Sequence, residues 1–186
     1  MTIYIALLRG INVGGKNIIK MADLRSVLET MGLKEVQTYI QSGNVLFKSD
    51  QEEESLRLMI GQGIEAAFGF FVQVILRKAE DLEWIITNCP FSAEKIKEAE
   101  ASSEGECLYV SLMMHAPTHE KIECLKTYKI DSDEYKVDGR EVFLLFKNSI
   151  RNSKLVSNLH KLDVPATVRN WKTINKLYAL ARSMED

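Results

Sequence analysis

Two short turn motifs, each between a pair of strand-like segments, constrain the fold of this 186-residue chain more than any other feature. Ser42-Gly43 separates VQTYIQ from NVLFKS, and Asp138-Gly139 separates DEYKV from EVFLLF. A glycine-containing turn between two such runs is a strong local signal for an antiparallel hairpin. The chain is therefore expected to contain two antiparallel hairpins, and a single parallel sheet is disfavoured.

The first hairpin lies at the centre of a longer pattern of elements. The apolar runs 2–9 and 72–78 are predicted to be strands. Apolar residues at helical spacing predict helices over 21–31 and 51–68, with Gly32 placed to end the first of them. The resulting order, β-α-β-β-α-β, is typical of the ferredoxin-like fold.

The second half of the chain repeats this order. A strand is predicted at 107–114, helices at 118–127 and 153–162, and an extended piece near 165–168 before a terminal helix from Trp171. We therefore expect an α/β (α+β) protein of two tandem ferredoxin-like plaits with antiparallel sheets. The predicted boundaries are 1–80 for the first unit, 81–105 for a helical connector and linker broken at Cys89-Pro90, and 106–186 for the second unit plus the terminal helix.

Composition limits the class of protein but not its activity. Apolar residues make up 46% and charged residues 27% of the chain, which argues against disorder. No run approaches the ~18 apolar residues of a membrane span, and the start has no features of a signal peptide. Its three cysteines are widely spaced and contain no CxxC motif, so we expect reduced thiols in a cytoplasmic protein without membrane attachment.

Charge is unevenly distributed along the chain, although the net charge is only −2. Residues 81–146 carry seven basic and fourteen acidic side chains, whereas residues 147–182 carry eight basic side chains and one acidic one. Residues 1–20 contain Arg9, Lys16 and Lys20 and no acid. Either the two basic segments build one positive patch, or they are ordinary solvated faces.

The glycine-rich loop after the first strand matches G-x-x-x-x-G-K over Gly10–Lys16. Asn17 stands where a phosphate-binding P-loop has Ser or Thr, the next helix begins several residues later, and hairpins contradict a parallel P-loop sheet. A nucleotide-hydrolysing P-loop is therefore disfavoured. Two interpretations remain: a loop that cradles an anion without hydrolysis, or a plain loop in which Gly14 and Gly15 supply positive φ angles.

Other motifs are incomplete. The run IYIALL resembles one RNA-recognition strand pattern, but SGNVLFKS lacks the paired aromatic residues of its partner, so Tyr4 is expected to be a packing residue. His115 and His119 have metal-ligand spacing, but Pro117 lies between them and no metal site is expected. No nucleophile–base pair is evident, so whether the protein is an enzyme stays open, with the residues favouring binding.

The terminal segment offers a second candidate anion site. Asn170 is a good helix N-cap, and the first-turn N–H groups with Arg169, Lys172 and the Thr173 hydroxyl could hold an anion. Alternatively, Trp171 simply anchors the helix; we expect it to bury best against the other unit.

Motifs spread over nearly the whole chain carry a family resemblance. LLRGINVGGKN, KMADLR, TYIQSGNVLF, DGREVFL, SKL and T-x-R-N-W-x-T-x-x-K-L occur in this order, and the chain resembles the bacterial family called domain of unknown function 1697. The resemblance implies a cytoplasmic bacterial protein with tandem αβ plaits and implies no activity. Lys172 departs from the RNWNT form that is frequent in the family. The family's signature positions fall here on Arg9, Gly10, Asn12, Gly14, Gly15, Lys16, Gln41, Ser42, Gly43, Asn44, Arg169, Asn170, Trp171, Thr173 and Lys176.

These observations favour a protein that binds an anionic ligand, with the phosphate of a nucleotide or nucleic acid as first candidate, in a basic cleft between the two units. The alternatives are an enzyme acting on a phosphorylated small molecule and a structural interaction module without a small ligand. No cofactor is indicated, and the oligomeric state stays open. The candidate ligand-binding residues are Arg9, Asn12, Gly14, Gly15, Lys16, Asn17, Ser42, Asn44, Lys154, Arg169, Asn170, Thr173 and Lys176.

Overall fold

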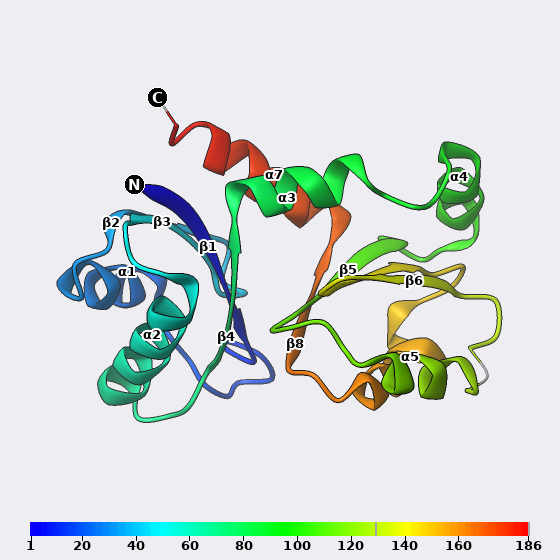
Figure 1. Ribbon diagram of the computed structural model, residues 1–186, viewed down its shortest axis with the longest axis horizontal. Helices are drawn as coiled ribbons and strands as arrows, with labels where there is room; N and C mark the ends of the chain where they lie inside the picture. Colours follow the sequence, from blue (N-terminus) through cyan, green and yellow to red (C-terminus); the bar gives the residue numbers. More distant parts are fainter. Residues whose placement is uncertain (129, 186) are drawn as a thin grey trace. The chain divides into compact units, whose positions relative to one another are not determined.

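The computed structural model describes residues 1–128 and 130–185 as a mixed α/β protein with two compact units (Figure 1). Met1–Trp84 and Asn175–Asp186 form the first unit, and Ile85–Ile174 form the second. Each unit contains one four-stranded antiparallel sheet. The division falls within two helices, so the chain passes from one unit to the other twice.

The first unit follows the predicted β-α-β-β-α-β order. Its sheet has the strand order β2-β3-β1-β4, so each β-α-β connection passes over one intervening strand. Antiparallel pairing joins every neighbouring pair of strands. The elements are β1 (Thr2–Arg9), α1 (Met21–Thr30), β2 (Lys34–Tyr39), β3 (Asn44–Ser49), α2 (Glu53–Phe68) and β4 (Gln73–Lys78).

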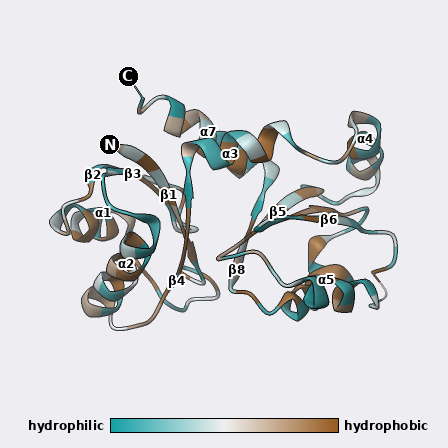
Figure 2. Cartoon of the chain, viewed as in Figure 1, coloured by the Kyte–Doolittle hydropathy of each residue, from teal (hydrophilic) through white to brown (hydrophobic). Residues whose placement is uncertain are grey.

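The core of this unit forms where apolar faces of α1 and α2 meet one face of the sheet (Figure 2). Leu24 and Leu28 of α1 and Ile60 of α2 are fully buried there. Tyr4 belongs to the same cluster, is 2% exposed, stacks on Phe47 and donates a hydrogen bond to the Gln51 carbonyl. The prediction that Tyr4 is a packing residue is confirmed, and its ring is not available to stack on an RNA base.

The second unit has the strand order β6-β7-β5-β8, also antiparallel throughout. Its core lies between the sheet and the helices α5 and α6, with Leu125 and Leu155 fully buried. Ser153 caps α6 as predicted, its hydroxyl accepting a hydrogen bond from the Val156 N–H. The elements are β5 (Leu108–Met113), α5 (His119–Lys126), β6 (Glu134–Asp138), β7 (Glu141–Leu145), a 3₁₀ turn (Ile150–Asn152), α6 (Lys154–Asn158), a second 3₁₀ turn (Leu159–Leu162) and β8 (Ala166–Asn170).

Three further helices complete the described residues. The predicted break at Cys89-Pro90 is confirmed, because it separates α3 (Ala79–Thr87) from α4 (Ala93–Ser102). The terminal helix is α7 (Trp171–Arg182). Residues 175–186 of this segment group with the first unit, although the sequence assigned the whole segment to the second. Leu177, Ala181 and Met184 are buried, and an amphipathic helix at a chain end does not reveal in its sequence which core it will cover.

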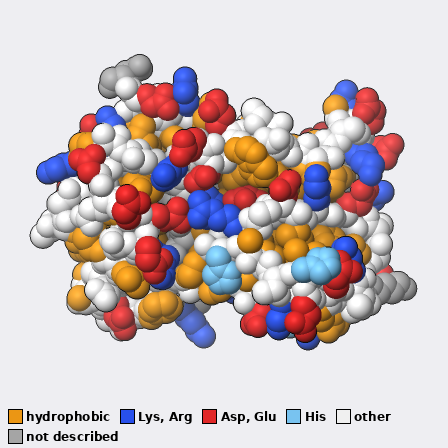
Figure 3. Space-filling model, in the orientation of Figure 1, with side chains coloured by type: hydrophobic (Ala, Val, Ile, Leu, Met, Phe, Trp, Pro, Cys, Tyr) orange, Lys and Arg blue, Asp and Glu red, His pale blue; other side chains and the backbone are white. Residues whose placement is uncertain are grey.

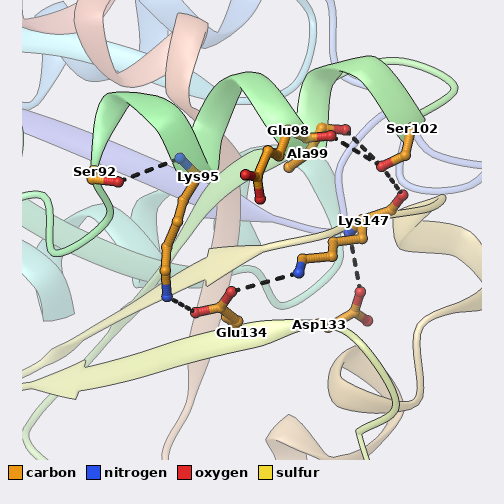
Figure 4. Close-up of polar contacts among 8 residues, drawn as sticks. All are labelled: Ser92, Lys95, Glu98, Ala99, Ser102, Asp133, Glu134 and Lys147. Atoms are coloured by element: carbon orange, nitrogen blue, oxygen red, sulfur yellow. Dashed lines mark hydrogen bonds and ion pairs between the residues drawn. The ribbon is translucent and has the colours of Figure 1, made fainter.

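Helix α4 is attached to the second sheet by apolar and polar contacts together, and Figure 4 shows the polar contacts. Ala99 packs with Leu108 and Leu145, while Lys95 forms an ion pair of 2.6 Å with Glu134. The Ser102 hydroxyl donates a hydrogen bond of 2.7 Å to the Lys147 carbonyl. Trp171 packs on this same cluster, so the α4 cluster of its own unit supplies apolar surface for its ring, and its burial against the other unit stays a prediction.

The two sheets share more than their strand order. In the first, Ile5 of β1 lies opposite Arg77 of β4, and a helix begins two residues after that arginine. In the second, Val110 of β5 lies opposite Arg169 of β8, and α7 begins two residues after that arginine. The common register shows that the edge strand of each sheet carries an arginine at an equivalent position.

Candidate functional site

Strand register brings three loops of the first unit to one end of its sheet. Arg9, the last residue of β1, lies opposite Gln73, the first residue of β4. Leu7 lies opposite Asn44, the first residue of β3. The loop after β1, the β2–β3 turn and the segment before β4 therefore meet at this end, where Figure 1 shows the loop after β1 and the start of β4 together. We call the surface formed by residues 9–20, 40–43 and 69–72 the rim.

Asn12 organises the longest loop of the rim. Its side-chain amide donates to the carbonyls of Ile19 and Gln41, both at 2.9 Å, and its oxygen accepts from the Ile19 N–H at 2.8 Å. Asn17 donates from its amide to the Gly10 carbonyl at 3.1 Å. Both asparagines have positive φ angles, which asparagine tolerates better than most residues. These amides shape the loop, and their predicted contact with a ligand stays a prediction.

The two glycines of the motif form a tight turn. Val13 and Lys16 form an antiparallel bridge, and Gly14 and Gly15 between them have φ angles of 59° and 72°. Positive φ at both central residues defines a type I′ turn, for which Gly-Gly is a favoured pair. Helix α1 begins only at Met21, so the loop does not run directly into a helix as a P-loop does.

The β2–β3 turn packs closely against the base of this loop. Gly43 has φ of 79°, and a Cβ added there would lie 2.8 Å from the Leu8 Cβ. The Leu8 N–H donates to the Gly43 carbonyl at 2.8 Å. Asn44 is fully buried and donates to the Tyr39 carbonyl and the Ser42 hydroxyl, so it closes the turn. Of the two candidate residues here, only Ser42 is exposed.

Three cations lie on the rim without an acid among its residues. Arg9, Lys16 and Lys20 are exposed, and none forms an ion pair within residues 1–128 and 130–185. Many lysines elsewhere are paired, and Figure 3 shows acidic and basic side chains interspersed over one face of the protein. Asp23, in the first turn of α1, is the acid that follows the rim most closely in the chain. The rim is therefore a locally positive surface on a chain of net charge −2.

Large apolar side chains are also exposed on the rim, a feature that sequence reasoning missed. Val13 is 66% exposed, Ile18 61%, Ile40 50% and Phe71 66%. The three segments that carry them are far apart in the sequence, so only the strand register shows that these four residues share one end of the sheet. Exposed apolar residues gathered in one place are typical of interaction surfaces.

The candidate residues of the terminal segment have structural partners. One Arg169 nitrogen donates to the Thr167 hydroxyl at 2.7 Å and to the Val168 carbonyl at 3.0 Å, and burial lowers the pKa of Arg169 to about 10. Asn170 caps α7, as predicted, by accepting a hydrogen bond of 2.8 Å from the Thr173 N–H. Thr173 is buried and Lys176 is exposed. That this segment shares a ligand with Lys16 stays a prediction.

Lys154 lies in a different environment from the other candidates. It forms an ion pair of 3.0 Å with Asp131 at the edge of a pocket of about 390 Å³ in the second unit. The Ser153 hydroxyl donates to Asp133 in the same pocket at 2.6 Å. With Lys154 as its one cation, this pocket does not favour an anion. Its lining residues, all of them polar, are Ser102, Glu104, Asp131, Ser132, Asp133, Asn148, Ser149, Asn152, Ser153 and Lys154.

Comparison with known proteins supports the family resemblance. The family model described as "Protein of unknown function (DUF1697)" matches residues 1–143. The chain belongs to this family. The DUF1697 match includes the whole rim, whereas the terminal segment around Arg169 lies beyond the matched residues.

A solved structure extends the comparison over nearly the full chain. The conserved bacterial protein SP0830 from Streptococcus pneumoniae is 27% identical, with a TM-score of 0.69, and the alignment covers 97% of this chain and 98% of that one. No curated protein matches this DUF1697 chain. Within the described residues, no helix is long and apolar enough to cross a membrane, and no group of three or more His, Cys, Asp or Glu residues could hold a metal ion.

Proposed function

We propose that this protein binds a phosphate-containing anionic ligand through the rim of its first unit. The observation that carries the proposal is the placement of Arg9, Lys16 and Lys20 on one surface whose residues include no acid. Gathering like charges without counter-ions costs stability, and an anion that neutralises them recovers it. The flexible, exposed ends of these side chains suit phosphate oxygens, which accept charge-assisted hydrogen bonds.

Local geometry adds support to the charge argument. The Gly14-Gly15 turn is exposed and has no side chains to keep a ligand away from the backbone. Helix α1 begins next to Lys20, and no side chain caps its first turn, so free N–H groups lie beside the rim, where Asp23 of the same turn offsets part of their attraction for an anion. Asn12 and Asn17 fix the loop before any ligand arrives, which lowers the entropic cost of binding.

Two finer assignments accompany this function. We infer that both units are ferredoxin-like plaits, because in each sheet the β-α-β connections straddle one strand, as this fold requires. We also infer a bacterial, cytoplasmic protein, for which the bacterial source of the similar SP0830 structure and three free cysteines are the support.

A thermal-shift screen of pyrophosphate, nucleotides and sugar phosphates tests the function, together with mass spectrometry of small molecules retained by the natively purified protein. A ligand present at 100 times its Kd adds about 2.7 kcal/mol to the free energy of unfolding. Lys16→Ala is expected to weaken this stabilisation. Lys34→Ala is the matched control, because Lys34 is an exposed residue of the same sheet at the opposite end of β2. If no anion shifts the melting temperature at low salt, the proposal is wrong.

A further inference from the structure

The rim combines charge with exposed apolar side chains, and this combination narrows the class of ligand. We propose that the rim binds single-stranded nucleic acid, whose phosphates contact the cations while a base stacks on Phe71. This inference rests on the function proposed above and specifies its ligand. The geometry that carries it is the presence of Arg9, Lys16, Lys20 and an exposed aromatic ring at one end of the same sheet.

The positions of the cations favour a ligand with repeated charges. Arg9 ends β1, Lys16 follows the glycine turn, and Lys20 directly precedes α1. They therefore occupy three separate positions along the loop, and each of them is exposed. A chain of phosphodiesters can reach several such sites at once, and proteins that bind single strands use positively charged surfaces that follow the backbone.

The apolar side chains supply what a nucleic-acid base requires. Phe71 is 66% exposed and belongs to the segment immediately before β4, at the same end of the sheet as Arg9. Exposed aromatic rings beside cations are the usual stacking surface for unpaired bases, with aliphatic side chains such as Ile18 and Ile40 extending the contact. In a duplex the bases are already stacked on one another, so Phe71 favours a single strand.

An anionic membrane surface would also be attracted to cations and apolar residues, but the outermost turn disfavours it. A loop that inserts into lipid carries its large apolar side chains at its tip. Here the tip is Gly14-Gly15, which has no side chains, and Lys16 follows it opposite Val13, so insertion would bring a charge into the bilayer together with only one apolar side chain of the turn. The same glycines let a nucleotide approach the backbone closely.

Fluorescence anisotropy with labelled twelve-residue oligo-dT and oligo-U measures the interaction directly. We expect binding that weakens with salt with a slope near −2 in log K against log[salt], because three phosphate contacts contribute about −0.7 each for a single strand. A duplex of the same length should bind more weakly at equal salt. Competition of ADP or pyrophosphate with the labelled oligonucleotide measures how well the protein binds phosphate groups that are not part of a nucleic-acid chain.

Two variants separate the charge contribution from the stacking contribution. Lys16→Ala should reduce the salt slope by about 0.7, whereas Phe71→Ala should weaken oligonucleotide binding about tenfold at an unchanged slope. Phe71→Ala should leave pyrophosphate binding unaltered. Lys34→Ala and Leu58→Ala are the matched controls, since both residues are exposed and lie away from the rim. Circular dichroism melts establish that each variant is folded.

The outcomes distinguish the inference from the function on which it rests. One result is that pyrophosphate binding depends on Lys16, but oligonucleotides bind no more tightly than pyrophosphate or their binding is unaffected by Phe71→Ala. In that case the inference is overturned and the function stands. If neither pyrophosphate nor any oligonucleotide binds at low salt, both are wrong. Co-sedimentation with phosphatidylserine vesicles that depends on Lys16 and Phe71, without oligonucleotide binding, would also overturn the inference in favour of a lipid surface.

Discussion

At the scale of single residues, the rim shows the difference between a chemically suggestive side chain and one that is available to a ligand. Asn12, Asn17 and Asn44 belong to motifs that suggested a binding site, yet the structure gives their amides intramolecular partners. Positive φ angles at Gly14 and Gly15 could be predicted from the sequence, whereas those at Asn12 and Asn17 were not predicted. Contacts between distant segments, such as that of Asn12 with Gln41, decide which side-chain amides already hydrogen-bond within the protein. Sequence spacing does not reveal these contacts.

Replacement of Asn12 tests its structural role. Asn12→Ala removes three hydrogen bonds and places alanine at a φ angle of 53°, so we expect the free energy of unfolding to fall by about 2 kcal/mol in urea denaturation. Asn152→Ala is the control, because Asn152 is exposed and its side chain makes no hydrogen bond within the described residues. A loss below 0.5 kcal/mol for Asn12→Ala, within the usual effect of a surface substitution, would contradict this role.

The three cysteines should differ in reactivity. Burial raises the pKa of both Cys107 and Cys89, so less reactive thiolate is present at a given pH, and Cys107 is also shielded from reagents. With a disulfide reagent at pH 8, we expect Cys124 to react first in the native protein and all three to react rapidly in urea. Cys124→Ser should remove only the fast phase; a surviving fast phase would show that Cys107 or Cys89 is accessible.

The raised pKa of Cys107 also has a consequence for stability. Because the pKa of Cys107 is raised on folding, any stability that this thiol contributes is present at neutral pH and is lost as the pH rises through the pKa of Cys107 in the folded protein.

At the scale of elements, periodicity and turn chemistry were sufficient to predict the order of strands and helices. Gly32 and Gly69 end α1 and α2 with positive φ, and Ser153 and Asn170 cap helices as their residue types indicate. The register could not be predicted, because it depends on which apolar faces meet in the core. The order of the elements alone therefore does not show whether the β2–β3 turn lies beside the loop after β1.

The glycines of these two turns offer a matched pair of substitutions. At Gly43 an alanine Cβ would meet Leu8 at 2.8 Å and would also require a φ of 79°. At Gly14 only the φ of 59° opposes it, because nothing lies within 4 Å. We expect Gly14→Ala to cost about 1 kcal/mol and Gly43→Ala at least twice as much in urea denaturation. Equal losses would show that the turn can move away from β1.

Helix α4 should owe its attachment more to apolar packing than to its ion pair. Lys95 and Glu134 are both partly solvated, and pairs of this kind contribute up to about 1 kcal/mol. Ile96 packs on the buried cluster that contains Ala99 and Leu108. We therefore expect Ile96→Ala to lower the melting temperature of the protein more than Lys95→Met does. The reverse order in calorimetry would assign the attachment to the ion pair.

At the scale of the whole molecule, the sequence predicted two units but not where the end of the chain belongs. Residues 147–182 look like one basic segment, yet the contacts divide them, with Arg169 in the second unit and Lys176 in the first. Within the first unit, Tyr178 of α7 donates a hydrogen bond of 2.8 Å to Glu83 of α3. Charge patterning describes the surface of a helix and carries no information about the core that the helix covers.

Truncation tests this assignment. Deletion of residues 175–186 removes the buried Leu177, Ala181 and Met184, and we expect a loss of several kcal/mol of stability, since burial of a leucine or methionine side chain contributes about 1.5–3 kcal/mol. Limited proteolysis should then show faster cleavage within residues 1–84. Deletion of residues 185 and 186 alone is the control. Unchanged protection of the first unit after the longer deletion would show that the helix is not part of it.

The division of the first unit between the two ends of the chain also determines when it can be completed during biosynthesis. Domains usually fold in the order in which the ribosome makes them. Here the second unit, Ile85–Ile174, is whole before Leu177 and Met184 of the first unit have been synthesised. The unit that is begun first is therefore finished last, and part of its apolar surface stays uncovered until Leu177, Ala181 and Met184 have been synthesised.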